Sequence, residues 1–152
     1  MALQTGFKFN SRDRTRSSLQ SLAVEGGFTE IVRLLLIIEK FNVNIKDDSE
    51  NTPLLKAAFH GHMEIDKLLL ANEKVDANSK DMMGRYTPLS QAIERGDIEI
   101  VQQIVATGKA DPNWTLDSSD VPLLIADKPG HAEIVQLLLA TGKADTSRLK
   151  RL

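Results

Sequence analysis

The sequence predicts an all-α fold, a solenoid of stacked helix-turn-helix units with projecting β-hairpin-like loops. Three observations predict it. A glycine followed three residues later by Glu-Ile occurs four times, with the glycines at positions 27, 61, 96 and 130, so the period is 34 to 35 residues. Apolar residues follow each glycine at helical spacing, and Thr-Pro pairs precede two of the units. A fixed period of this length is typical of a solenoid, in which each unit stacks on its neighbours.

Each unit begins with a short helix, which is clearest in the second copy. Thr52 is placed to cap this helix, and Pro53 suits its first position because proline loses no donor that the helix needs there. The helix continues through Leu54 and Ala57 and ends near Gly61, because a left-handed residue ends a helix at the least cost when it is glycine.

A second helix follows the glycine in every copy. In the second copy it begins near Glu64, where an acidic side chain meets the favourable end of the helix dipole. Ile65, Leu68 and Leu69 are spaced i, i+3 and i+4 and so form one apolar face. In the first copy residues 31–38 are apolar on more than one side, which predicts a helix that is sandwiched between neighbours.

The second helix is followed by about a dozen polar residues, and no unit of this size can close a core alone. Alanines at equivalent positions would let the first helices of successive units approach one another: Ala23, Ala57, Ala92 and Ala126. Turn-forming residues between Asn78 and Thr87 predict an extended loop. The third copy carries one extra residue in this loop, so we expect the loop to bulge.

These motifs resemble those of ankyrin repeats. The resemblance rests on the TPLL and TPLS boxes, the GH pair between helices, the EIV and LLL runs and the endings KADPN and KVDAN. It implies four repeats, at about residues 10–44, 45–78, 79–113 and 114–146, in a single domain over residues 1–152. The KAD ending also resembles repeats of long fungal ankyrin proteins.

Composition excludes several classes of function. The net charge is −2 and there is no long basic run, so we expect no nucleic-acid partner. The chain has no cysteine, which excludes thiolate chemistry and favours a reducing compartment, the cytoplasm or the nucleus. No run of about 18 apolar residues predicts a membrane span, and the first residues lack the apolar stretch of a signal peptide.

The sequence predicts no enzyme, cofactor or metal. It contains no phosphate-binding GxxxxGKS loop, no HExxH and no GxSxG motif. His62 and His131 occupy the same turn, where an imidazole most simply bonds to the backbone between helices. A metal site formed by His60 and His62 is the alternative.

Two features depart from the repeat pattern. Asp66 stands where the other copies have valine, and since burying an unpaired carboxylate is expensive, we expect it to be partly exposed or paired with a lysine. The closing helix carries Ile134 and Leu137 to Leu139 with no fifth unit after it. The chain is therefore expected to be a piece of a longer array or to self-associate through its C-terminal repeat.

The resemblance implies a module that binds a partner protein on the concave face formed by the loops and the first helices, without catalysis. The positions of such repeats that vary and contact partners are Asp48, Ser49, Asn51, Lys56, Phe59, His60, Met82, Met83, Arg85, Tyr86, Gln91, Glu94, Arg95, Asp117, Ser118, Asp120 and Lys128, with Arg14, Thr15, Ser17 and Glu25 beside them. Phe59 is the first candidate, because an aromatic at the solvent-facing end of the first helix has no evident role in the core.

Alternatives remain open at this level. Met82, Met83 and Tyr86 predict an adaptable contact surface, but Met82 or Tyr86 could instead pack on the neighbouring loop. A structural spacer within a longer array needs no contact surface at all. An enzyme acting on a small molecule or polyol needs an enclosed pocket.

Overall fold

A computed structural model describes residues 19–113 and 131–144. In these ranges all the regular secondary structure is helical: α1 (Leu19–Glu25), α2 (Thr29–Ile37), α3 (Pro53–His60), α4 (Met63–Leu70), α5 (Pro88–Arg95), α6 (Ile98–Ala106) and α8 (Ala132–Ala140). They comprise three helix-turn-helix pairs and the second helix of a fourth. The expected all-α solenoid is confirmed, while the repeat boundaries and the single domain over residues 1–152 stay predictions.

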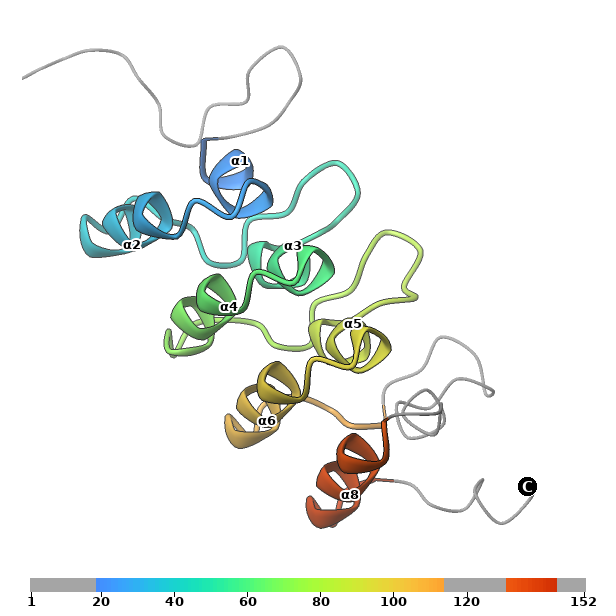
Figure 1. Cartoon of the computed structure of the whole chain (residues 1–152). Helices are drawn as coiled ribbons and strands as arrows, with labels where there is room; N and C mark the ends of the chain where they lie inside the picture. Colours follow the sequence, from blue (N-terminus) through green and yellow to red (C-terminus); the bar gives the residue numbers. More distant parts are fainter. Residues whose placement is uncertain (1–18, 114–130, 145–152) are drawn as a thin grey trace, which may run out of the picture.

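The helices form two parallel layers (Figure 1). The first helices α1, α3 and α5 stack in one row, and the second helices α2, α4, α6 and α8 stack in the other. The loops that precede α3 and α5 project beyond the row of first helices. The stack therefore presents these loops and the exposed sides of the first helices on one face.

The helix ends follow the predicted signals. Thr52 caps α3 by accepting a hydrogen bond from the backbone N–H of Leu55, and Pro53 is the first helical residue. The helix stops at Gly61, whose φ of 71° is the left-handed conformation that glycine adopts without strain. A Cβ at Gly61 would lie 2.2 Å from the Arg95 guanidinium of the next repeat, so the absence of a side chain at Gly61 also leaves room for Arg95.

The core lies between the two layers. Ala23, Ala57 and Ala92 are almost completely buried between the first helices, as their spacing predicts. Larger aliphatic side chains fill the space beside the second helices, among them Ile65 and Ile100, which are also fully buried. Each repeat thus completes the core of the repeat before it.

A row of asparagines in the loops that follow the second helices joins successive repeats. Asn44 Nδ2 donates to the carbonyl of Lys74 at 2.7 Å, and Asn44 Oδ1 accepts from the backbone N–H of Asp76 at 2.8 Å. Asn78 makes the same two bonds to the following loop at 2.7 and 2.8 Å. Asn113 donates to the corresponding carbonyl one repeat later. Each asparagine side chain therefore substitutes for a peptide group and fixes the spacing of two loops.

The expectation for Asp66 is wrong. Its side chain is fully buried, and within the described residues neither carboxylate oxygen has a hydrogen-bond partner. Helix α4 keeps the same packing as the other second helices, so Asp66 lies where Val32 and Val101 lie, while Lys67 turns outward to Glu99 at 2.6 Å. Burial raises the pKa of Asp66 to about 8, so the buried acid is largely protonated at neutral pH.

The expectation for the first repeat's second helix is also wrong. Ile31, Leu34 and Ile37 on α2 are exposed instead of sandwiched between neighbours. Only Val32 and Leu35 are buried in this helix, on the side that faces the core. The reason is positional, because α2 is the outermost second helix of the described stack.

Candidate functional site

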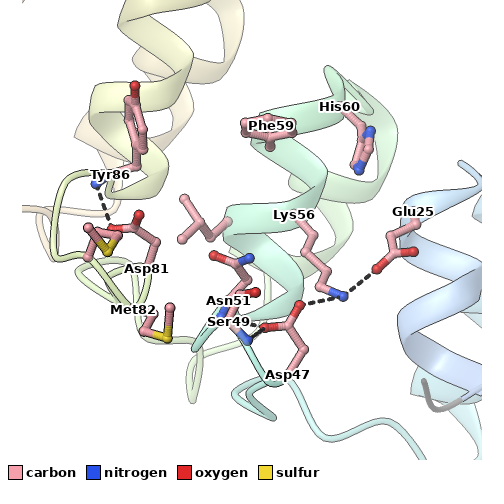
Figure 2. A pocket seen from close by; sticks show the side chains of 12 residues that line it. Glu25, Asp47, Ser49, Asn51, Lys56, Phe59, His60, Asp81, Met82 and Tyr86 are labelled. Atoms are coloured by element: carbon pink, nitrogen blue, oxygen red, sulfur yellow. Dashed lines mark hydrogen bonds and ion pairs between the residues drawn. The ribbon is translucent and has the colours of Figure 1, made fainter. Parts of the chain in front are cut away.

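A groove of ≈ 400 Å³ lies on the face of the stack that carries the projecting loops (Figure 2). It is bounded by α1, α3 and two loops, which we call finger 1 (residues 45–52) and finger 2 (residues 79–87). Its lining residues are Glu25, Asp47, Ser49, Asn51, Leu55, Lys56, Phe59, His60, Asp81, Met82, Met83 and Tyr86. The groove therefore combines residues from the first three repeats.

An aspartate organises each finger. In finger 1, Asp47 N donates to the carbonyl of Asn51 at 3.1 Å, and Asp47 Oδ1 accepts from the backbone N–H groups of Ser49 and Asn51 at 2.8 and 2.9 Å. In finger 2, Asp81 N donates to the carbonyl of Tyr86 at 3.2 Å, one residue further along the chain. The extra residue is accommodated inside this turn, so the predicted bulge is confirmed.

The two fingers are joined to each other. The backbone N–H of Met82 donates to the carbonyl of Ser49 at 2.8 Å. At their bases, the hydroxyls of Thr52 and Ser79 lie 2.7 Å apart, and both residues are buried. These contacts hold Met82 at a fixed distance from finger 1.

Lys56 forms the floor of the groove. Its side chain is buried (8% exposed), and its ammonium pairs with the carboxylates of Glu25 and Asp47, the latter at 2.8 Å (Figure 2). Burial by itself would lower the pKa of Lys56, but the hydrogen bonds and charges of the two carboxylates outweigh burial and raise it. Burial by itself would likewise raise the pKa of Asp47, and hydrogen bonds from Lys56, Asn51 and Ser49 outweigh burial and lower it. Lys56 and Asp47 are therefore charged at neutral pH, and the ammonium of Lys56 is engaged with both carboxylates.

Large apolar side chains border this polar floor. Phe59 is 56% exposed, Met82 64% and Met83 56%. The predicted solvent-facing position of Phe59 is confirmed, and the alternative that Met82 merely packs on the neighbouring finger is not supported by its exposure. Tyr86 is half-buried beside them.

Three aromatic rings continue from Phe59 towards the preceding repeat. The Phe59 and His60 rings meet edge to face, with centroids 5.5 Å apart, and the rings of His60 and His62 stack at 5.6 Å. His62 Nε2 lies 2.9 Å from the backbone carbonyl of Glu25, which confirms the predicted bond to backbone for His62, whereas His131 Nδ1 has no partner within the described residues. In residues 19–113 and 131–144 no group of three or more side chains could hold a metal ion.

The groove contains about half of the predicted contact residues: Ser49, Asn51, Lys56, Phe59, His60, Met82, Met83 and Tyr86. Asp48, Arg85, Glu94 and Arg95 are exposed beside it. Gln91 and Lys56 are buried instead of solvent-facing. Asp117, Ser118, Asp120 and Lys128, and likewise Arg14, Thr15 and Ser17, lie outside the described residues.

Two groove-lining acidic residues were not predicted, Asp47 and Asp81. Both carboxylates line the groove, and each accepts a hydrogen bond from a backbone N–H group of its own finger. A signal for them exists in the sequence, because Asp47 stands five residues before the capping Thr52 and Asp81 stands six before Thr87. The recurrence of an aspartate at this place in both fingers would have identified Asp47 and Asp81 as candidates.

Comparison with known protein families places the chain beside a repeat family. The family described as ankyrin repeats (3 copies) matches residues 3–81 and 20–115. No curated protein sequence matches the chain. Among the helices of the described ranges, none is long and apolar enough to cross a lipid bilayer.

Proposed function

Because the chain belongs to the ankyrin-repeat family, whose repeats are generally protein-interaction modules, we propose that it binds a partner protein in the groove between its two fingers and does no chemistry. The observation that carries this proposal is the group of exposed apolar side chains, Phe59, Met82 and Met83, at the edge of a preformed groove. Large apolar groups gathered on a surface are typical of an interaction site.

The rigidity of the groove supports the proposal. The bond between Met82 and Ser49 and the pairing of Lys56 with Glu25 and Asp47 are made before any partner arrives. A preformed surface loses less conformational entropy on binding than a mobile one. The methionines supply adaptability at the edge, since their unbranched side chains fit varied surfaces.

The charge of the groove indicates the chemistry of the partner. Three carboxylates line it, those of Glu25, Asp47 and Asp81, against the single ammonium of Lys56, which leaves an excess of two negative charges with histidine neutral. Phe59 and Tyr86 add aromatic faces that attract cations. We therefore propose a partner segment in which a lysine or arginine stands between apolar side chains.

The test is affinity capture from a lysate of the native host, comparing the wild-type chain with a Phe59, Met82, Met83 and Tyr86 quadruple alanine variant. A matched control carries alanine at Gln102, Glu133 and Gln136, which are exposed on the second helices. The wild type and the control are expected to retain the same partner, and the quadruple variant to lose it while keeping its helical circular dichroism. Identical capture by all three proteins would contradict the groove as the binding site.

The alternatives make different predictions. A structural spacer would capture the same proteins with and without the groove side chains. An enzyme acting on a small molecule would need charged groups available for the reaction, whereas Glu25, Asp47 and Lys56 are engaged with one another. We propose a non-catalytic scaffold for these reasons.

Two further parts of the proposal concern self-association and location. Self-association through the C-terminal repeat is supported by Leu139, which is 42% exposed on α8. A cytoplasmic or nuclear location is supported by the absence of cysteine from the sequence.

A further inference from the structure

Exposed apolar side chains gather at the N-terminal end of the described stack. Ten large hydrophobic residues are exposed in the described chain, and six of them lie between positions 22 and 38: Leu22, Phe28, Ile31, Leu34, Ile37 and Ile38. We call these six residues the α2 end face. None of them lines the groove, so the proposed binding function does not account for them.

Equivalent positions in the later repeats show what normally covers this face. Ile31 corresponds to Ile65, Ile100 and Ile134, and it is 40% exposed whereas the other three are 0 to 1% exposed. Each of these later isoleucines has a repeat before it. The position of Ile31 is therefore one that a preceding repeat buries.

Two more positions lead to the same conclusion through direct contacts. Leu22 corresponds to Lys56, which bonds to Ser21 and Glu25 of the preceding repeat. Phe28 corresponds to His62, whose ring bonds to the backbone of Glu25 and lies over Gly27. At the end of the stack, Leu22 and Phe28 replace the polar groups of these internal positions. A surface that covers this end must therefore be apolar.

The other end of the stack offers a surface of that kind. Val135 on α8 corresponds to Val32 and Val101, which are fully buried by the repeat that follows them, but Val135 is only half-buried. Leu139 corresponds to Leu70, which is 8% exposed, and to Leu36 and Val105, which are half-buried, whereas Leu139 is 42% exposed. Val135 and Leu139 thus occupy positions that face the following repeat.

We propose that the α2 end face binds the α8 end of a second copy of this chain, so that copies associate head to tail. The contact continues the packing that already joins α2 to α4, α4 to α6 and α6 to α8. Because the two ends are different surfaces, the association is heterologous and each copy keeps one free end, which permits chains of copies.

The experiment is sedimentation velocity over a range of protein concentrations, with one end of the stack disabled at a time. The N-end variant is Phe28→Asp with Leu34→Glu, where aspartate is the residue that the third repeat has at the position of Phe28. The C-end variant is Leu139→Glu. The control is Gln102→Glu with Ala106→Glu, which places two negative charges on exposed positions of α6, between the two ends of the stack.

The wild type and the control are expected to grow in average mass with concentration. Each end variant alone is expected to remain monomeric, with a dissociation constant raised at least about tenfold. An equimolar mixture of the two end variants should stop at a 1:1 heterodimer, because each supplies the end that the other lacks. Circular dichroism of each variant distinguishes lost association from lost folding.

Three outcomes would overturn the proposal. A wild type that stays monomeric at millimolar concentration would mean that no second copy covers the face, as when residues 1–18 of the same chain cover it. A C-end variant that still dimerises alone would indicate a symmetric contact between two α2 end faces. A mixture of folded end variants that forms no heterodimer would exclude the head-to-tail contact. All of these results are independent of partner capture by the groove.

Discussion

The first helices of the second and third repeats begin and end in the same way but present different surfaces. Helices α3 and α5 begin with the same capping Thr-Pro pair and end at left-handed glycines, with φ of 71° and 74°. At the exposed end of the first helix, however, the second repeat has Phe59 and the third has Glu94. The comparison teaches that residues at the helix ends maintain the fold, so that the solvent-facing positions can vary between an apolar and a charged surface.

The same two repeats also differ inside. The second repeat buries a charged ammonium at Lys56 and an unpartnered acid at Asp66, where the third repeat has Gln91 and Val101. Burying ionisable groups lowers stability unless their partners compensate. The second repeat, which contributes most to the groove, is thus expected to be the less stable of the two.

The largest effect is expected from replacing the buried acid. The folded-state pKa of Asp66, about 8, lies above its ordinary value of 3.8, so the folded state holds this proton more tightly than the unfolded state does. The resulting stabilisation is complete below about pH 4 and is lost as the pH rises to about 8. Asp66→Val should therefore raise the free energy of unfolding by about 3 kcal/mol at pH 8, and by less at pH 5.

Urea unfolding at pH 5 and pH 8 measures this difference. The matched change in the third repeat, Val101→Asp, should lower stability and introduce the same dependence on pH. Asp66→Asn keeps the shape without the titration and should abolish the dependence. Equal pH slopes for wild type and Asp66→Val would show that the acid is not buried in solution.

The next largest effect concerns the floor of the groove. Lys56→Met leaves Glu25 and Asp47 without their cation, and because both carboxylates are partly exposed we expect a loss of only about 2 kcal/mol at pH 7. Gln91→Met at the equivalent position should be nearly neutral, since Gln91 Oε1 has no hydrogen-bond partner within the described residues. Thermal unfolding of both variants makes the comparison, and similar losses in the two repeats would contradict the role assigned to the ion pairs.

The helix caps should give a smaller effect. Thr52→Val and Thr87→Val each remove a hydroxyl that accepts from the first turn, at 3.4 Å in α3 and 3.1 Å in α5. Each change should lower the free energy of unfolding by about 1 kcal/mol. Chemical denaturation is the measurement. A loss confined to one variant would show that the two repeats do not depend equally on the shared cap.

The smallest effect on stability is expected at the surface. Phe59→Ala should change the free energy of unfolding by less than about 0.5 kcal/mol, because the ring is mostly exposed. The same variant should lose the captured partner, whereas Glu94→Ala in the third repeat should retain it. A strongly destabilised Phe59→Ala would show that the ring has a structural role and would remove it from the binding site.

Local signals made the helical scaffold predictable from sequence. Thr52, Pro53 and Gly61 act through their own backbone neighbourhood, so their roles are fixed by residues only a few positions away. The period then placed equivalent residues of successive repeats beside one another, as Ala23, Ala57 and Ala92 illustrate.

The groove was predictable only in part, because it depends on contacts between repeats. Lys56 reaches Glu25, which lies 31 residues earlier, and no local pattern reports this pairing. The burial of Asp66 follows from its repeat position, which is buried in the first and third copies as well, whereas the cost of burying a carboxylate predicts exposure. Protonation resolves the conflict, since the neutral acid is far less costly to bury than the carboxylate.

The asparagine row has a consequence for how such a chain changes length over evolutionary time. Asn44 and Asn78 make identical bonds to the loops that follow them, so the connector at one boundary is interchangeable with the connector at the next. A gene duplication that inserts one whole period adds an asparagine together with a loop, and the backbone of the next loop offers the same carbonyl and N–H groups to it. Growth or shortening by complete units therefore requires no compensating substitution among these asparagine bonds, whereas an insertion of any other length would leave an asparagine without its acceptor.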